Sequence, residues 1–157
     1  MSKIAIIDES ETFYRYLGRV LSALGYEHEN AGDIEDGFSL IKAYQPDLVI
    51  SEMHFTNHSG LDLCEKLKED RCTADIPVVI VSTDGTSGKI RQAVQAGCAD
   101  YLTKPMTVGE VHQMLQRNLP FAVKRRAIRL NIEEDVVLVA GGRRIETRTA
   151  TLGEGGM

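Results

Sequence analysis

Short apolar runs rich in β-branched residues alternate along the chain with stretches whose apolar residues recur at helical spacing. The runs lie at residues 4–7, 28–31, 48–50, 78–81 and 101–103, and the second is weaker and more polar than the others. The residues that share helical faces between the runs are Phe13, Leu17, Val20, Leu21 and Leu24; Ile34, Gly37, Phe38 and Ile41; Leu61, Cys64 and Leu67; and Val108, Val111, Met114 and Leu115. Such alternation is typical of a parallel sheet covered by helices on both faces. The pattern predicts an α/β fold, a (βα)5 doubly wound domain with a parallel five-stranded sheet.

The pattern changes after residue 121. A basic segment at 124–129 precedes an apolar run at 136–140, the Gly141-Gly142 pair and a second strand-like run at 143–148. Two such runs around a glycine pair are typical of a β-hairpin. We therefore divide the chain into a domain at residues 1–121 and a tail at 122–157, which holds a basic linker and a hairpin.

The composition is that of a globular protein without a membrane span. Of the 157 residues, 43% are hydrophobic and 26% are charged. Apolar runs such as 78–81 and 136–140 are far shorter than the ~20 residues that a membrane helix needs, and the run at 4–7 is too short for a signal-peptide core. We expect a cytoplasmic protein that does not bind membranes.

Charge divides the chain in the same place as the pattern. Residues 1–121 carry 11 Lys and Arg against 18 Asp and Glu, a net charge of minus seven, whereas residues 122–157 carry 7 against 5, a net charge of plus two. Binding to nucleic-acid phosphates needs clustered Lys and Arg. An acidic first domain therefore argues against direct DNA binding.

Three cysteines, Cys64, Cys72 and Cys98, are an odd number without the spacing of metal ligands. In a reducing compartment such residues are ordinary thiols. We interpret them in this way, and not as a disulfide or a zinc site.

Polar side chains follow the predicted strands where each strand ends. Asp8 and Glu9 follow the first strand, Glu52 ends the third, Ser82 and Thr83 follow the fourth, and Lys104 and Pro105 follow the fifth. Because ligands of such sheets gather beyond the carboxyl ends of the strands, we expect these residues to converge. Carboxylate oxygens suit a hard cation such as Mg²⁺, and a lysine with a hydroxyl suits a phosphoryl group. The alternative is that the acidic residues before Ser10 only cap the first helix.

Several stretches in order resemble the receiver family of two-component systems, over roughly residues 2–121. They are 4–10 (IAIIDES), 46–52 (PDLVISE), 60–61 (GL), 77–82 (PVVIVS) and 96–105 (AGCADYLTKP). The resemblance implies a signalling domain and not an enzyme, with a sensor histidine kinase or another signalling protein as partner. It also implies a cis bond between Lys104 and Pro105.

The resemblance assigns roles at the strand ends. Asp8 and Glu9 would be the acidic pair that holds Mg²⁺, with Glu52 and the backbone carbonyl of His54 as further ligands. Ser82 would be the hydroxyl switch and Tyr101 the aromatic switch, and Lys104 would contact the phosphoryl oxygens. For Tyr101 the alternative is a packing role at a strand end. We interpret His54 and His58 as solvated loop residues and not as a metal pair.

Glu52 stands at the phosphoacceptor position, where the family has aspartate. Its additional methylene moves the carboxylate outward by about 1.5 Å, which makes ordinary phosphorylation doubtful because phosphoryl transfer depends on placement. Two alternatives remain. The carboxylate either engages Lys104 and Ser82 and favours an active-like state, or turns to solvent in an inert interaction module.

The tail resembles the opening of a PilZ domain, which binds cyclic di-GMP through an Arg-x-x-x-Arg motif and a later Asp/Asn-x-Ser-x-x-Gly motif. Arg125 and Arg129 match the first motif, and only Gly156 matches the second. The alternative function is thus a cyclic di-GMP effector with the receiver as a dimerisation platform, although a basic linker with a solvated hairpin is the favoured interpretation. A hairpin alone is marginal in water, so we expect a homodimer in which two tails pair edge to edge.

Overall fold

The computed structural model describes residues 2–130, with side chains described through residue 119. Strands and helices alternate throughout this part of the chain. The strands are β1 (Lys3–Ile7), β2 (Glu27–Ala31), β3 (Leu48–Glu52), β4 (Val78–Ser82) and β5 (Asp100–Thr103). The helices are α1 (Glu11–Ala23), α2 (Ile34–Tyr44), α3 (Gly60–Glu69), α4 (Ser87–Gln95) and α5 (Val108–Leu130).

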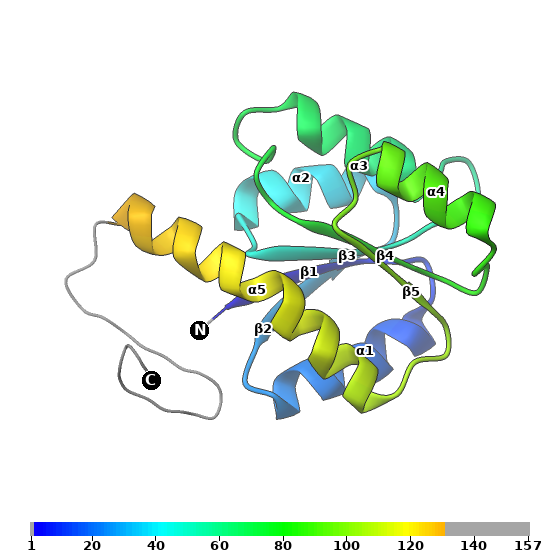
Figure 1. The fold of residues 1–157 in the computed structure, drawn as a ribbon, viewed down its shortest axis with the longest axis horizontal. Coiled ribbons are helices and arrows are strands. Elements are labelled where there is room, and N and C mark those ends of the chain that lie inside the picture. The colour runs from blue at the N-terminus through cyan, green and yellow to red at the C-terminus, as the bar shows by residue number, and fades with distance from the viewer. Residues whose placement is uncertain (1, 131–157) are drawn as a thin grey trace. The chain divides into compact units, whose positions relative to one another are not determined.

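The strands form one parallel sheet in the order β2-β1-β3-β4-β5. Helices α1 and α5 cover one face, and α2, α3 and α4 cover the other (Figure 1). The predicted doubly wound α/β fold is therefore confirmed. Because the chain passes from β2 across β1 to β3, the strand order reverses between β1 and β3, which is where ligands of such folds gather.

Each face of the sheet buries its own apolar core. In β1, Ile4 and Ile6 face the core shared with α1 and α5, while Ala5 and Ile7 face the core shared with α2 and α3. Strands buried on both faces are continuous apolar runs. The edge strand β2 is mostly exposed, which explains its weak apolar signal in the sequence.

Side chains at the helix starts define where the helices begin. Ser10 accepts a hydrogen bond from the backbone N–H of Phe13 and caps α1. Ser59 caps α3 and forms a reciprocal capping box with Asp62. These bonds satisfy N–H groups that have no partner inside the helix.

The last helix extends beyond the predicted domain boundary at residue 121. Helix α5 continues to Leu130, so the basic segment 124–129 is helical, in keeping with the high helix propensity of Lys, Arg, Ala and Leu. The predicted hairpin, the second PilZ-like motif and the tail-mediated homodimer fall outside the described residues. Within residues 2–130, no helix has the length and apolar character needed to cross a bilayer.

Gly60, the first residue of α3, is held against the end of β3. Its N–H donates to the carbonyl of Met53 at 2.6 Å, and a Cβ at this position would collide with the backbone oxygen of Glu52. The backbone cannot move away as a flexible side chain can. The return of the chain from β3 into α3 therefore depends on glycine.

We predict that Gly60→Ala destabilises the domain by about 2 kcal/mol or more, because overpacking against backbone forces the surrounding structure to shift. The matched control is Gly88→Ala in α4, where a Cβ meets nothing within 4 Å and alanine is expected to stabilise the helix by up to ~1 kcal/mol. Urea denaturation measures both free energies of unfolding. Equal effects of the two substitutions would contradict the assigned contact.

Candidate functional site

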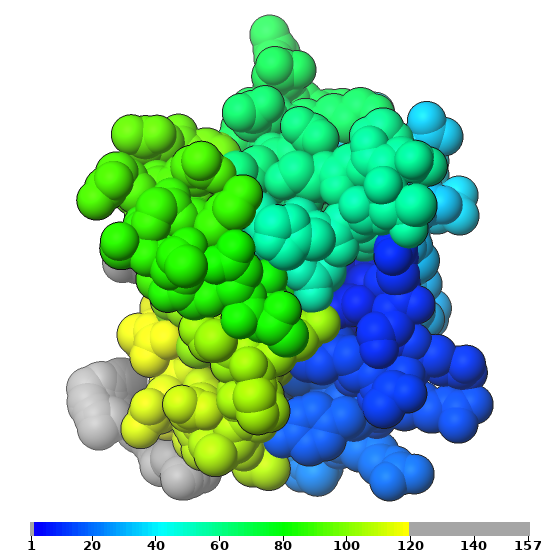
Figure 2. All heavy atoms as spheres, turned by 90° about the vertical axis from the view of Figure 1, so that its right-hand side faces the viewer, coloured from blue at the N-terminus to red at the C-terminus, as the bar shows by residue number. Residues whose placement is uncertain are grey.

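The loops at the carboxyl edge of the sheet bring together four of the predicted residues. Asp8 follows β1, Glu52 and Ser82 end β3 and β4, and Lys104 follows β5. Figure 2 shows this edge, where segments near the start of α1 (blue), after β3 (blue-green) and after β5 (yellow-green) lie close together. The convergence predicted from the strand ends is therefore observed.

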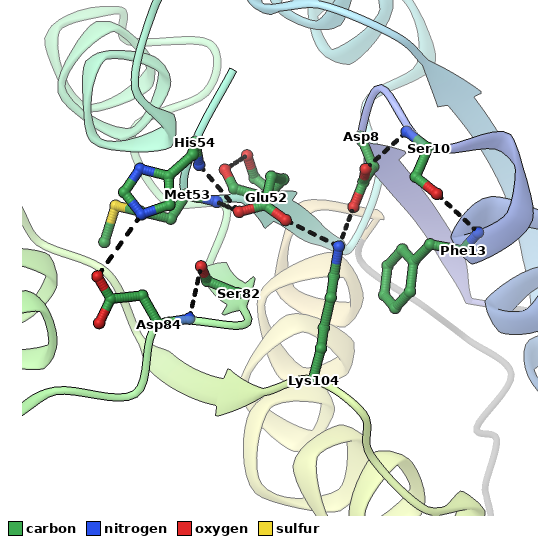
Figure 3. A network of polar contacts seen from close by, with 10 residues as sticks. Asp8, Ser10, Phe13, Glu52, Met53, His54, Ser82, Asp84 and Lys104 are labelled. Carbon is green, nitrogen blue, oxygen red and sulfur yellow. Dashed lines mark hydrogen bonds and ion pairs between the residues drawn. The ribbon is translucent and has the colours of Figure 1, made fainter. Parts of the chain in front are cut away.

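An ammonium between two carboxylates forms the centre of the site (Figure 3). Lys104 Nζ donates to Asp8 Oδ2 at 2.9 Å and to Glu52 Oε1 at 2.8 Å. The side chain of Lys104 is 15% exposed, that of Asp8 is 4% exposed and that of Glu52 is 12% exposed. Ion pairs that are largely removed from water are screened little by salt, so this triad is electrostatically strong.

The second oxygen of the Glu52 carboxylate is bound by the loop that follows β3. Glu52 Oε2 accepts hydrogen bonds from the backbone N–H groups of Met53 at 2.7 Å and His54 at 2.9 Å. The alternative in which Glu52 turns to solvent is therefore wrong. The other alternative had Glu52 engage both Lys104 and Ser82. Its contact with Lys104 is observed.

The expected contact between Glu52 and Ser82 is not observed, since no hydrogen bond joins these two residues among the described side chains. Ser82 Oγ accepts instead from the backbone N–H of Asp84 at 3.2 Å. The hydroxyl of Tyr101 donates to the backbone carbonyl of Asp84, and its half-buried ring packs against the core beside α2 and α3. Ser82 and Tyr101 thus meet at one loop residue, separate from the ammonium.

Phe13 covers the ammonium from α1. The Nζ of Lys104 lies 4.1 Å from the centroid of the Phe13 ring, a distance at which the face of the ring attracts a cation. Burial tends to lower the pKa of Lys104, but hydrogen bonds and charges from Glu52 and Asp8 outweigh it and raise the pKa above its ordinary value. Lys104 therefore remains charged at neutral pH.

The expected magnesium ligands carry oxygen atoms of the right type, and each is bound by donors within the chain: Asp8 and Glu52 by Lys104, and Glu9 by Thr56. Glu9 accepts hydrogen bonds from the backbone N–H of Thr56 at 2.8 Å and from its hydroxyl at 3.2 Å. Asp8 Oδ1 accepts from the N–H of Ser10 at 2.8 Å. Within residues 2–119, no three His, Cys, Asp or Glu residues are gathered to hold a metal ion. In this arrangement the carboxylates bind Lys104, Ser10 and Thr56, and the expected binding of Mg²⁺ stays a prediction.

Other predicted residues lie outside this centre. His54 and His58 are exposed, as expected for loop histidines, and His54 Nε2 lies 3.8 Å from Asp84 Oδ2. Arg125 and Arg129 lie on α5, with side chains beyond the described ones. The Lys104-Pro105 bond is cis, as the resemblance implies.

Sequence reasoning missed the parts played by Phe13, Thr56 and Asp84. For Phe13 the sequence predicts only a place on the apolar face of the first helix, because it does not show that this position adjoins Lys104. Thr56 gives no signal in a polar loop. Asp84 could have been found, since it lies two residues after the hydroxyl at the end of β4.

We predict that Lys104 titrates above the ordinary lysine pKa and that Glu52→Gln lowers its pKa, since burial is then opposed by the charge of Asp8 alone. The charged Lys104 stabilises the fold at pH values below the pKa that lysine has in the unfolded chain, near 10.4. This stabilisation is lost as the pH rises through the higher pKa of Lys104 in the folded state. Carbon-13 NMR of the lysine Cε measures the titration. Glu65→Gln removes an exposed charge on α3 as a control, and a pKa equally affected by both substitutions would contradict the assignment.

Comparisons with known proteins agree with this geometry. The model of the response regulator receiver domain family matches residues 4–116. RpaA of Synechocystis sp., described as a DNA-binding dual master transcriptional regulator, is 33% identical over 134 residues, which cover 82% of this chain and 56% of RpaA. Chemotaxis protein CheY1 of Helicobacter pylori is 28% identical over 116 residues, which cover 73% of this chain and 94% of CheY1.

A solved structure of the chemotaxis protein CheY4 of Vibrio cholerae has the same fold, with a TM-score of 0.73 at 22% identity over 76% of this chain and 99% of that chain. The chain spans about half the length of the first curated relatives, 56% of RpaA and 47% of the Pseudomonas aeruginosa phosphate regulon regulator PhoB. The family match covers both the sheet and the loops that carry Asp8, Glu52, Ser82 and Lys104. The chain therefore belongs to the response regulator receiver domains of two-component systems.

Proposed function

We propose that this receiver holds a signalling state that is set by Glu52 and not by phosphorylation, and that it controls an attached or partner output. The observation that carries the proposal is the 2.8 Å bond between Glu52 Oε1 and Lys104 Nζ in a largely buried site. Receiver domains typically bind Mg²⁺ for phosphorylation and interact with histidine kinases or other signalling proteins. Here the Glu52 carboxylate already binds Lys104, the residue that would otherwise bind the oxygens of an incoming phosphoryl group.

The arrangement of Glu52 disfavours phosphoryl transfer to it. One carboxylate oxygen is bound by an ammonium and the other by two backbone N–H groups. An attacking oxygen must be freed from these bonds and aligned with the phosphoryl donor, and a misplacement of about 1 Å can cost on the order of a hundredfold in rate. Glu52 is thus better suited to bind Lys104 than to attack a phosphoryl donor.

We further propose that Ser82, Asp84 and Tyr101 transmit the state of the site. Glu52 binds the backbone N–H of His54, whose ring faces Asp84, and Asp84 binds both Ser82 and Tyr101 through its backbone. Glu52 therefore reproduces the anion contact with Lys104 while the hydroxyl switch keeps a separate partner. This arrangement supports a fixed state that resembles the phosphorylated state only in part.

The output is proposed to be a signalling protein or an attached domain. The chain covers 94% of CheY1 but only 56% of RpaA. It therefore resembles both a relative that it spans almost completely and a longer relative that continues beyond the matched part. The net charge of residues 1–121 is minus seven, from 11 basic against 18 acidic residues. We propose that this part of the chain does not bind DNA directly, because it lacks the required excess of positive charge.

We predict that Glu52→Asp gains a stable phosphoryl adduct upon incubation with acetyl phosphate and Mg²⁺, whereas the wild type gains none. The shorter side chain withdraws the carboxylate by about 1.5 Å, which releases Lys104 to bind a phosphoryl oxygen. Intact-mass spectrometry detects the adduct. Glu52→Gln is the matched control that keeps the side-chain length without the charge, and it should remain unmodified.

A phosphoryl adduct on Glu52 of the wild type would contradict the proposal that its signalling state does not depend on phosphorylation. Peptide mapping distinguishes such an adduct from modification elsewhere. If folded Glu52→Asp does not react, the length of the Glu52 side chain is not what prevents phosphorylation, and this part of the proposal is wrong.

A further inference from the structure

Two cysteines from distant parts of the chain lie in contact outside the site described above. Cys64 on α3 and Cys98 in the turn between α4 and β5 are 34 residues apart, and their Sγ atoms are 3.3 Å from each other. Cys64 is fully buried and Cys98 is half-buried. All three cysteines of the chain are free, and the third, Cys72, is exposed.

The two sulfur atoms meet because their backbones are fixed independently. The left-handed conformation of Gly97, with a φ of 95°, turns the chain after α4. The N–H of Cys98 then donates to Ala93 O at 3.0 Å, and the N–H of Ala99 donates to Val78 O on β4 at 2.7 Å. On the other side, the S–H of Cys64 donates to Ala96 O at 3.3 Å. The contact is thus built by α3, α4 and β4 together.

We propose that Cys64 and Cys98 form a reversible disulfide that fastens α3 to the turn between α4 and β5. The oxidant is a low-molecular-weight disulfide such as oxidised glutathione. Closure to a disulfide bond of about 2.05 Å requires the sulfur atoms to move little more than 1 Å.

The exchange takes place in two balanced steps. Cys98, the more exposed thiol, loses its proton and attacks one sulfur of oxidised glutathione, which releases one glutathione molecule. The thiolate of Cys64 then attacks the Cys98 sulfur of the mixed disulfide and releases the second glutathione. The protein thiols lose two electrons to the glutathione disulfide, and their two protons end on the two released thiols.

Electrostatics around the pair favour the second step over the first. The S–H of Cys98 donates to the sulfur of Cys64, which raises the pKa of Cys98 and lowers that of Cys64. The charge of Lys68, one helical turn after Cys64 on α3, lowers both pKa values. The initial attack by Cys98 is therefore slow at neutral pH, and Lys68 is the charge that still favours the Cys64 thiolate in the second step, after the S–H of Cys98 has been consumed.

The bond would restrain a helix that buries little of its surface. Ala93 is the only buried residue of α4, while Ile90 and Val94 on the same helix are 37% and 65% exposed. Cys98 also lies three residues before Tyr101. A disulfide at the end of α4 therefore limits the movement of α4 and of the strand that carries Tyr101.

The test uses the full chain with Cys72→Ser, which removes the exposed thiol and leaves the pair. After incubation of the folded protein with oxidised glutathione, we expect both thiols to be lost without a retained glutathione adduct, and peptide mapping to join residues 64 and 98. The melting temperature should rise by roughly 5–10 °C, because the bond closes a loop of 34 residues in the unfolded chain. Dithiothreitol should reverse both changes, and amide exchange in α4 should be several-fold slower in the oxidised form.

Cys98→Ser in the same background is the matched control, because this half-buried position tolerates a hydroxyl better than buried Cys64 does. It should keep its single thiol or a simple glutathione adduct and show no rise in melting temperature. The proposal is overturned if the Cys72→Ser protein keeps two free thiols, stops at a mixed disulfide, or forms the bond only after unfolding in urea. Unchanged amide exchange in α4 would overturn the proposed restraint.

Discussion

The site depends on one constraint, the placement of the Lys104 ammonium between the carboxylates of Asp8 and Glu52. The charges come from the ends of three different strands, and all three are largely withdrawn from water. A buried charge without a partner costs several kcal/mol, so each of these residues holds the others in place. The register of β1, β3 and β5 and the loops beyond them must satisfy this pairing at the same time.

That constraint is also the basis of the role proposed for Glu52. The Glu52 carboxylate reaches Lys104 and gives the ammonium a second partner within the chain. Its other oxygen ties the same side chain to the N–H groups of Met53 and His54, and Gly60 allows α3 to start directly against this strand end. In the proposed function this contact holds the receiver in one state, while Ser82 and Tyr101 keep their separate partner, Asp84.

Much of the fold and the membership of the site could be predicted from the sequence, because apolar periodicity fixes the strands and the strand ends fix which polar residues meet. The direction of each side chain could not be predicted in this way. Whether Glu52 binds Lys104 or Ser82, and whether Glu9 binds a cation or Thr56, depends on where the loops place these side chains. The contact between Cys64 and Cys98 was missed for the same reason, since spacing along the chain does not reveal the turn that joins them.

The central claim is that the bond between Glu52 and Lys104 is strong because it is buried, and a double-mutant cycle tests it most directly. The cycle compares Glu52→Gln, Lys104→Met and the double variant by urea denaturation. The exposed pair Glu11 and Arg15 has the same 2.8 Å separation and serves as the matched control, with an expected coupling below about 0.5 kcal/mol. A coupling of about 2 kcal/mol or more between Glu52 and Lys104 is predicted, and a value no larger than that of the control pair would contradict the account.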